Sequence, residues 1–157
     1  MRLHLLYIAS PAQLVDVRNA LVRLSAKELP ESAPLKEAFE FQHRLLGQQP
    51  VQINLLSEID TVSTHLRHFP VDLLIYDERG PDGIPAVQAI TQINKEVQAL
   101  GDLWGPDFIF PMSRVVAILE EKQRDLRVFE LGRLHVRDVC LAPKGLIQVL
   151  LWLKDVL

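Results

Sequence analysis

This sequence has almost no cysteine, no long apolar run and no excess of basic charge. Its single cysteine, Cys140, excludes an intramolecular disulfide. The Met1–His4 opening leads into an apolar run too short for a signal peptide. The longest apolar stretch, Leu146–Leu153, falls far short of the roughly 20 residues that span a bilayer. We therefore expect a soluble chain in a reducing cytoplasm, with no membrane contact.

The balance of charge argues against one class of partner. The chain carries 17 Lys and Arg against 20 Asp and Glu, for a formal net charge of -3. The basic residues are interspersed with acidic ones, whereas binding to a phosphate backbone needs them clustered. We expect no direct contact with nucleic acid.

The common signatures of enzymes are also missing. The chain has no Gly-rich phosphate loop, no Gly-x-Ser-x-Gly nucleophile elbow and no His-Glu-x-x-His motif. His65 and His68 are three residues apart, which suits a metal, but no nearby Cys or third His completes a site. We therefore expect no catalytic residue, no bound metal and no cofactor.

The composition and the order of elements predict one α/β domain over residues 1–157. Apolar residues make up 48% of the chain and charged residues 24%, close to the average for soluble globular proteins. Five short apolar segments are predicted as strands: Leu3–Ile8, Val51–Leu56, Val71–Tyr76, Arg114–Leu119 and Val136–Leu141.

Helical patterns separate these strands. The predicted helices run from Pro11 to about Lys27, over Thr61–His68, from Pro85 to about Leu100, over Arg124–Leu134 and over Gly145–Leu157. Two segments are predicted as insertions: one before the second strand, with a short amphipathic helix at Leu35–Leu46, and an aromatic loop before the fourth, Gly101–Met112.

Alternating strands and helices predict a flavodoxin-like, five-stranded parallel sheet in the order 2-1-3-4-5, with helices on both faces. Ligand sites in such sheets lie beyond the carboxyl ends of the strands, between the first and third. Ile8–Ser10 and Asp77–Arg79 are therefore expected at the same rim.

Two segments carry a resemblance to a known family. Val71–Asp77, followed by Pro81-Asp82-Gly83 and a helix, resembles the third strand and phosphoacceptor loop of response-regulator receivers. Asp138–Pro143 is similar to the fifth strand of that family. The resemblance implies a two-component signalling domain with Asp77 in the phosphoacceptor position, and a signalling protein or output domain as partner.

The remaining chemical positions of the family are replaced. Ile8, Ala9 and Ser10 stand where the family has, after the first strand, the acidic pair that holds Mg²⁺. Glu120 replaces the hydroxyl residue after the fourth strand, and Ala142 replaces the lysine before Pro143. Lys144 follows that proline and is expected to point elsewhere. A degenerate, non-catalytic pseudo-receiver that acts by protein binding is the leading hypothesis.

Two alternatives remain open. In one, the chain is a receiver that accepts a phosphoryl group at Asp77, and then Asp77→Asn abolishes its output. In the other, it is a small flavodoxin-like enzyme or nucleotide binder with a pocket at the rim, built from Ser10, Asp77, Arg79 and Glu120.

The last helix and the aromatic loop are the candidate interfaces. Four apolar residues of the helix fall outside its core-facing stripe, and they suit a homodimer or output face: Ile147, Leu151, Trp152 and Val156. In the loop, Trp104, Phe108 and Phe110 are either interface anchors or a plug over an open end of the sheet.

Overall fold

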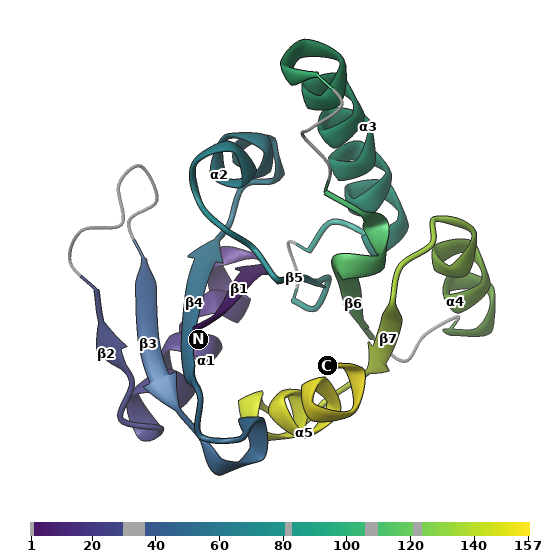
Figure 1. Ribbon diagram of the computed structural model, residues 1–157. Coiled ribbons are helices and arrows are strands. Elements are labelled where there is room, and N and C mark those ends of the chain that lie inside the picture. Colours follow the sequence, from purple (N-terminus) through teal and green to yellow (C-terminus); the bar gives the residue numbers. More distant parts are fainter. Residues whose placement is uncertain (1, 30–36, 81–82, 106–109, 121–123) are drawn as a thin grey trace.

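A single seven-stranded sheet with helices on both faces organises the computed structural model (Figure 1). The structure describes residues 2–29, 37–80, 83–105, 110–120 and 124–157. The strand order is β2-β3-β4-β1-β5-β6-β7. The strands are β1 (Leu3–Ile8), β2 (Lys27–Glu28), β3 (Ala38–Gln42), β4 (Pro50–Leu56), β5 (Leu73–Asp77), β6 (Val115–Leu119) and β7 (Asp138–Leu141).

Five α-helices and three single-turn 3₁₀ helices accompany the described strands. The α-helices are α1 (Pro11–Arg23), α2 (Val62–His68), α3 (Ala86–Trp104), α4 (Arg124–Arg133) and α5 (Leu146–Val156). The 3₁₀ helices are η1 (Arg44–Leu46), η2 (Ile59–Thr61) and η3 (Met112–Arg114).

The parallel part of the sheet confirms the predicted strand order. β1 pairs in parallel with both β4 and β5, β5 pairs with β6, and β6 pairs with β7. Counted along the chain, these five strands have the order 2-1-3-4-5. Each parallel connection crosses over through a helix, because two parallel neighbours cannot be joined by a tight turn.

The predicted number of strands is wrong, because two more strands precede the second predicted one. β3 lies in the first insertion, and β2 lies where the first helix was expected to end, since α1 stops at Arg23. β3 pairs antiparallel with β4, and β2 pairs antiparallel with β3.

The helix predicted at Leu35–Leu46 is wrong as well, although Leu35 lies outside the described residues. Phe39 and Phe41 alternate with polar residues and both bury their side chains, so this segment follows the period of a strand. Of the described residues in that range, 37–46, only Arg44–Leu46 is helical.

The second insertion is partly helical. α3 continues to Trp104, one turn beyond the predicted end at Leu100, and Gly105 follows it with φ +90°. The η3 turn then leads into β6. The first part of the aromatic segment is therefore an extension of the preceding helix.

Two apolar clusters, one on each face of the sheet, form the core. α1 and α5 cover one face, where Leu14, Leu21 and Leu150 are buried. α2 and α3 cover the other face, where Ile90 and Ile93 have no exposed surface. β5, in the middle of the sheet, is buried along its whole length, as expected for a parallel strand covered on both sides.

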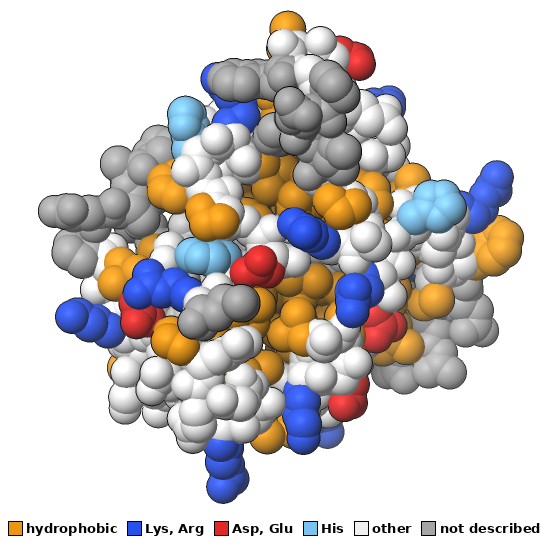
Figure 2. Space-filling model, viewed as in Figure 1, with side chains coloured by type: hydrophobic (Ala, Val, Ile, Leu, Met, Phe, Trp, Pro, Cys, Tyr) orange, Lys and Arg blue, Asp and Glu red, His pale blue; other side chains and the backbone are white. Residues whose placement is uncertain are grey.

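The charges on the surface are mixed. On the face shown in Figure 2, basic and acidic side chains surround apolar ones and form no continuous basic patch. Among the helices described, none combines the length and apolar character that a membrane span needs.

Candidate functional site

The rim of the sheet brings together the turn after β1 and the loop after β5, as the sequence predicts. Ile8, the last residue of β1, pairs with Tyr76 of β5. Gly80 comes so close to Ser10 that a Cβ at Gly80 would lie 2.9 Å from the Ser10 hydroxyl oxygen. Gly80 also has φ +106°, which favours glycine.

Only two residues connect β1 to α1 at this rim. Ser10 is the N-cap, and its hydroxyl oxygen accepts a hydrogen bond from the Gln13 amide at 3.4 Å. Pro11 then occupies the first helical position, where its missing N–H costs nothing. Both features confirm the predicted helix start.

Asp77 is fully buried at the end of β5, and Arg79 holds both of its carboxylate oxygens. Arg79 Nε donates to Oδ1 at 2.9 Å, and Arg79 Nη2 donates to Oδ2 at 2.8 Å. The backbone amide of Arg79 adds a third bond to Oδ1 at 3.0 Å. This planar two-point contact is the strongest geometry open to a carboxylate and a guanidinium.

Tyr7 of β1 donates the remaining hydrogen bond to this carboxylate. Its hydroxyl lies 2.6 Å from Asp77 Oδ2. Burial, together with the neighbouring Asp77 charge, raises the pKa of Tyr7 well above its ordinary value of 10.0. The phenol therefore stays protonated and donates throughout the physiological range of pH.

Arg79 also ties this network to the far side of the rim. Its Nη1 donates to the carbonyl oxygen of Pro143 at 2.6 Å, and its side chain is 15% exposed. Burial by itself lowers the pKa of Arg79, but the hydrogen bonds and the charge of Asp77 more than offset this and raise it. The guanidinium thus joins β5 to the turn between β7 and α5.

These donors and acceptors do not fit the magnesium ion that receiver chemistry needs. Mg²⁺ prefers carboxylate oxygens, and Arg79 engages both oxygens of Asp77. Ala9 and Ser10 supply no second carboxylate at the end of β1. Among the described residues, no three His, Cys, Asp or Glu side chains form a group that could hold a metal.

A second buried network surrounds Glu78. Its Oε2 accepts from the Ala86 amide at 2.9 Å and pairs with Arg127 of α4, and its Oε1 accepts from the Glu120 amide at 3.2 Å. Pro85 occupies the N-cap position of α3 and makes no side-chain hydrogen bond there, so Glu78 caps this helix from outside.

The replaced family positions have structural roles or face solvent. Glu120 is exposed, and its Oε1 accepts from the Gly80 amide at 3.2 Å. Ala142 is exposed with φ +42°. Lys144 lines a cleft between α1 and α5, and among the described residues its side chain forms no hydrogen bond or ion pair with Asp77.

The predicted interface on the last helix is partly exposed. Ile147 and Leu151 lie one turn apart and are each 46% exposed. Trp152 is half-buried, and its indole N–H donates to Asp138 Oδ2 at 3.1 Å. Val156 was expected on the exposed flank, but it packs in the core with 7% exposure, so that assignment is wrong.

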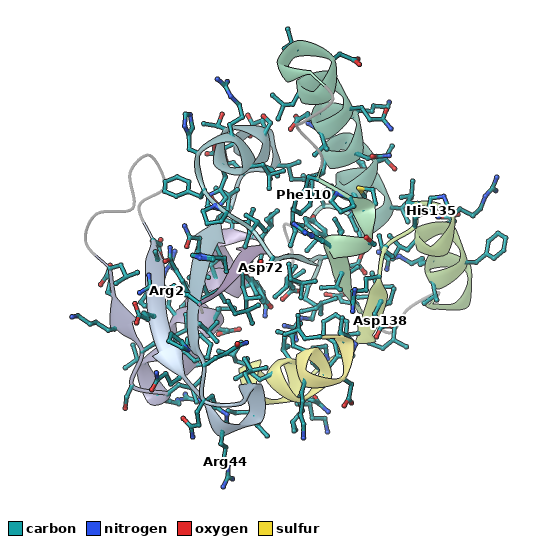
Figure 3. The ribbon with its side chains drawn as sticks, viewed as in Figure 1. Arg2, Arg44, Asp72, Phe110, His135 and Asp138 are labelled. Carbon is teal, nitrogen blue, oxygen red and sulfur yellow. The ribbon has the colours of Figure 1, made fainter. Side chains whose placement is uncertain are left out.

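The aromatic loop contributes to the core. Phe110, a candidate interface anchor, is instead buried in the apolar cluster that α3 forms with the sheet (Figure 3). The interface expectation for Phe110 is therefore wrong, and the alternative of a plug fits it. Phe108 lies outside the described residues, as does the side chain of Trp104.

Two residues of the networks are missing from the candidate sites that the sequence predicts. The sequence indicates Tyr7 only as part of an apolar strand and Arg127 only as part of a helix. A buried tyrosine needs a hydrogen-bond partner for its hydroxyl. A tyrosine two residues before the rim therefore indicates a polar partner among the rim residues. Nothing in the sequence pairs Arg127 with Glu78.

Similarity to solved structures defines the fold. The receiver domain of the TMAO respiratory system response regulator TorR has a TM-score of 0.53 at 10% identity, with 98% of this chain and 94% of that chain covered. A candidate response regulator from Chloroflexus aurantiacus gives 0.56 at 10% identity, covering 99% and 98%. The G domain of the T. maritima iron transporter FeoB gives 0.53 at 12%, covering 99% of both.

A scan of protein-family models and a search of curated proteins found no match. The chain therefore has an α/β fold similar to that of receiver domains. Because a G domain matches equally well, this similarity concerns the fold alone.

Proposed function

We propose that this chain is a receiver-like signalling module that acts by binding another protein and carries no phosphoryl group. The proposal depends above all on the Asp77 carboxylate, which is buried and engaged by Arg79 and Tyr7 through four hydrogen bonds. A phosphoryl acceptor needs a free oxygen and a metal to neutralise the incoming charge. Neither fits beside the Arg79 guanidinium.

Phosphorylation chemistry gives the direct test. The protein is incubated with Mg²⁺ and acetyl phosphate, or with Mg²⁺ and beryllofluoride, and its intact mass and its NMR spectrum are compared before and after. We expect no added mass and no change around the rim. Asp77→Asn is the matched control, and stoichiometric modification that this variant abolishes would overturn the proposal in favour of a working receiver.

The outer face of α5 supports a protein partner, either an output domain or a second copy of the chain. Ile147 and Leu151 form an exposed apolar pair on a helix whose other apolar residues pack inward. Leu151→Glu should abolish partner capture, and should convert any homodimer to a monomer in light scattering. Val22→Glu, at an equally apolar and more exposed site on α1, is the control and should change neither.

A nucleotide binder is the second candidate, and the similarity to the FeoB G domain favours it. The connection from β1 to α1 weighs against it, because phosphate loops cradle their ligand with several glycine-rich residues before a helix. Here Ala9 and Ser10 alone make that connection. A rise in melting temperature with GDP, GTP or ATP, lost in Arg79→Gln, would favour this candidate instead.

A further inference from the structure

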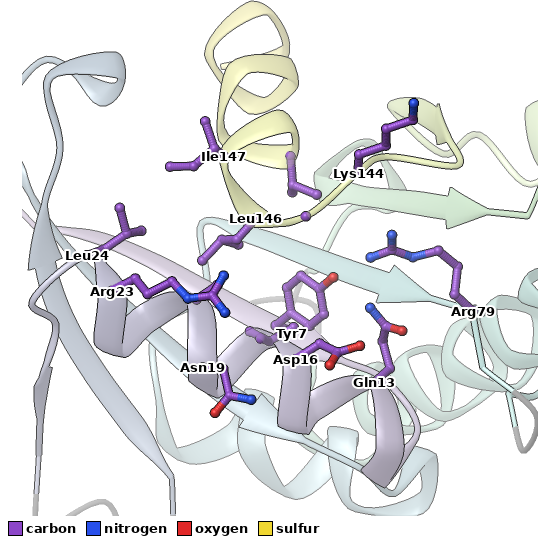
Figure 4. A pocket seen from close by; sticks show the side chains of 14 residues that line it. Tyr7, Gln13, Asp16, Asn19, Arg23, Leu24, Arg79, Lys144, Leu146 and Ile147 are labelled. Atoms are coloured by element: carbon purple, nitrogen blue, oxygen red, sulfur yellow. The ribbon is translucent and has the colours of Figure 1, made fainter.

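A cleft of about 500 Å³ lies between α1 and the beginning of α5, on the face of the sheet that these helices cover (Figure 4). This volume is within the range of small-molecule sites, roughly 300 to 1,000 Å³. Its walls are apolar along both helices and are formed by Val17, Ala20, Leu24, Leu146, Ile147 and Val149.

The polar groups of the cleft include three cations. Arg23 extends from α1 toward Tyr7, Arg79 lies at the opposite end, and Lys144 lies beside the first turn of α5 (Figure 4). Within the described part of the chain, Arg23 and Lys144 form no ion pair. Both are exposed, so they are free to contact a ligand without breaking any contact in that part of the protein.

Arg79 adds a donor that the rim does not use. A guanidinium has five N–H groups. Asp77 accepts from two of them and Pro143 from a third. The Tyr7 hydroxyl also interacts with this guanidinium. At least one N–H group therefore remains on a side chain that lines the cleft and whose position is fixed by its other bonds. A fixed donor loses little conformational entropy when it binds a ligand.

The charge facing the cleft remains positive when every carboxylate is included. Arg23, Arg79 and Lys144 contribute three positive charges, against one negative charge on Asp16 at the cleft and one on Asp77 behind Arg79. One positive charge is left. A bound molecule with one negative charge would balance it, whereas the net charge of the whole chain is negative.

We propose that this cleft binds a small amphipathic organic anion, a molecule with one carboxylate or comparable group on an apolar body. The apolar part packs between α1 and α5, and the anionic group lies against the cations. The site is independent of the chemistry of Asp77, which keeps its bonds to Arg79 and Tyr7. The proposal therefore stands or falls separately from the proposed function.

Calorimetric titration with 2-naphthoate tests this site, because that anion combines a flat apolar body with one carboxylate. We expect saturable binding in the micromolar to millimolar range. 2-Naphthamide, which lacks the charge, and acetate, which lacks the apolar body, should each bind much more weakly. NMR shifts on binding should concentrate on α1 and the first turns of α5.

Charge-removing variants locate the anion. Arg23→Gln and Lys144→Gln should each weaken naphthoate binding by about threefold to tenfold, since each removes one exposed charge contact. Arg44→Gln removes an exposed arginine that points away from the body of the protein (Figure 3) and should leave the affinity unchanged. All three variants should unfold as the wild type does.

Three outcomes would overturn the proposal. One is the absence of saturable binding at millimolar naphthoate. The second is equal binding of the uncharged amide, which would indicate a purely apolar surface. The third is an affinity that falls as much in Arg44→Gln as in Arg23→Gln, which would indicate attraction to the overall charge rather than to this cleft.

Discussion

The rim around Asp77 and the cleft between α1 and α5 share two residues, Tyr7 and Arg79, but differ in how their charges are satisfied. At the rim, Asp77 has no exposed surface and each of its oxygens accepts two hydrogen bonds. At the cleft, Arg23 and Lys144 are exposed and form no ion pair within the described part of the chain.

This difference separates structural charges from available ones. A buried charge with every partner in place holds segments together, and removing one partner leaves an uncompensated charge. An exposed charge without a partner contributes little to folding but can meet a ligand. The same arginine serves both regions, because a guanidinium has more donors than one carboxylate can use.

The largest expected effect is at the rim. Arg79→Met should lower the free energy of unfolding by about 3 to 5 kcal/mol, because the buried Asp77 carboxylate loses its counter-charge. Urea denaturation measures this loss. The double variant Asp77→Asn, Arg79→Met should lose less than Arg79→Met alone, since it buries no unpaired charge. A loss below about 1 kcal/mol in Arg79→Met would mean that Asp77 reaches water.

The next effect concerns the hydroxyl of Tyr7. Tyr7→Phe keeps the ring in the core but removes the 2.6 Å hydrogen bond to Asp77. We expect a loss of roughly 2 kcal/mol, because the acceptor is a buried carboxylate. Tyr76→Phe removes the 2.5 Å bond to the neutral Ile84 carbonyl and serves as the matched control, with a smaller expected loss. Equal losses would contradict a special role for Asp77.

Acid sensitivity should arise away from both regions, at His65 of α2. His65 is 2% exposed and stacks on Phe69, and burial lowers its pKa from 6.5 to about 4. The unfolded chain therefore takes up a proton at a higher pH than the folded protein does. Stability falls as the pH drops from about 6.5 toward 4, by about 2 kcal/mol between pH 7 and pH 5.

Denaturation at these two pH values checks the assignment. His65→Leu should remove this part of the pH dependence, whereas Tyr7→Phe should keep it. If Tyr7→Phe removed this pH dependence instead, the rim would be the acid-sensitive region. The contrast between satisfied charges at the rim and unpaired charges at the cleft would then fail.

The smallest effect on stability is expected at the cleft. Arg23→Gln should change the free energy of unfolding by no more than about 0.5 kcal/mol, as is usual for surface substitutions without buried contacts. A larger loss in urea denaturation would show that Arg23 has a structural partner. The rim and the cleft would then differ only in how strongly their charges are paired.

Local sequence patterns determined the parallel core, the strand order and the meeting of Ser10 with the loop after Asp77. Apolar runs mark strands buried on both faces, and the crossover rule limits how such strands are ordered. Ser10 and Pro11 mark a helix start through their own local chemistry. The strands and the helix start depend on neighbouring residues, and the rules of parallel sheets then place Ser10 and the loop after Asp77 at one rim, so the sequence alone was sufficient.

The tertiary structure decided which groups meet. β3 became a strand because β4 offers it a pairing edge, which overrode a helical pattern in the insertion. Val156 and Phe110 are buried because packing covers them from elements distant in the sequence. Asp77 is enclosed by Tyr7, 70 residues away, and by Arg79, two residues further along the chain. Such contacts depend on where side chains point after the sheet has formed, and local sequence does not record those directions.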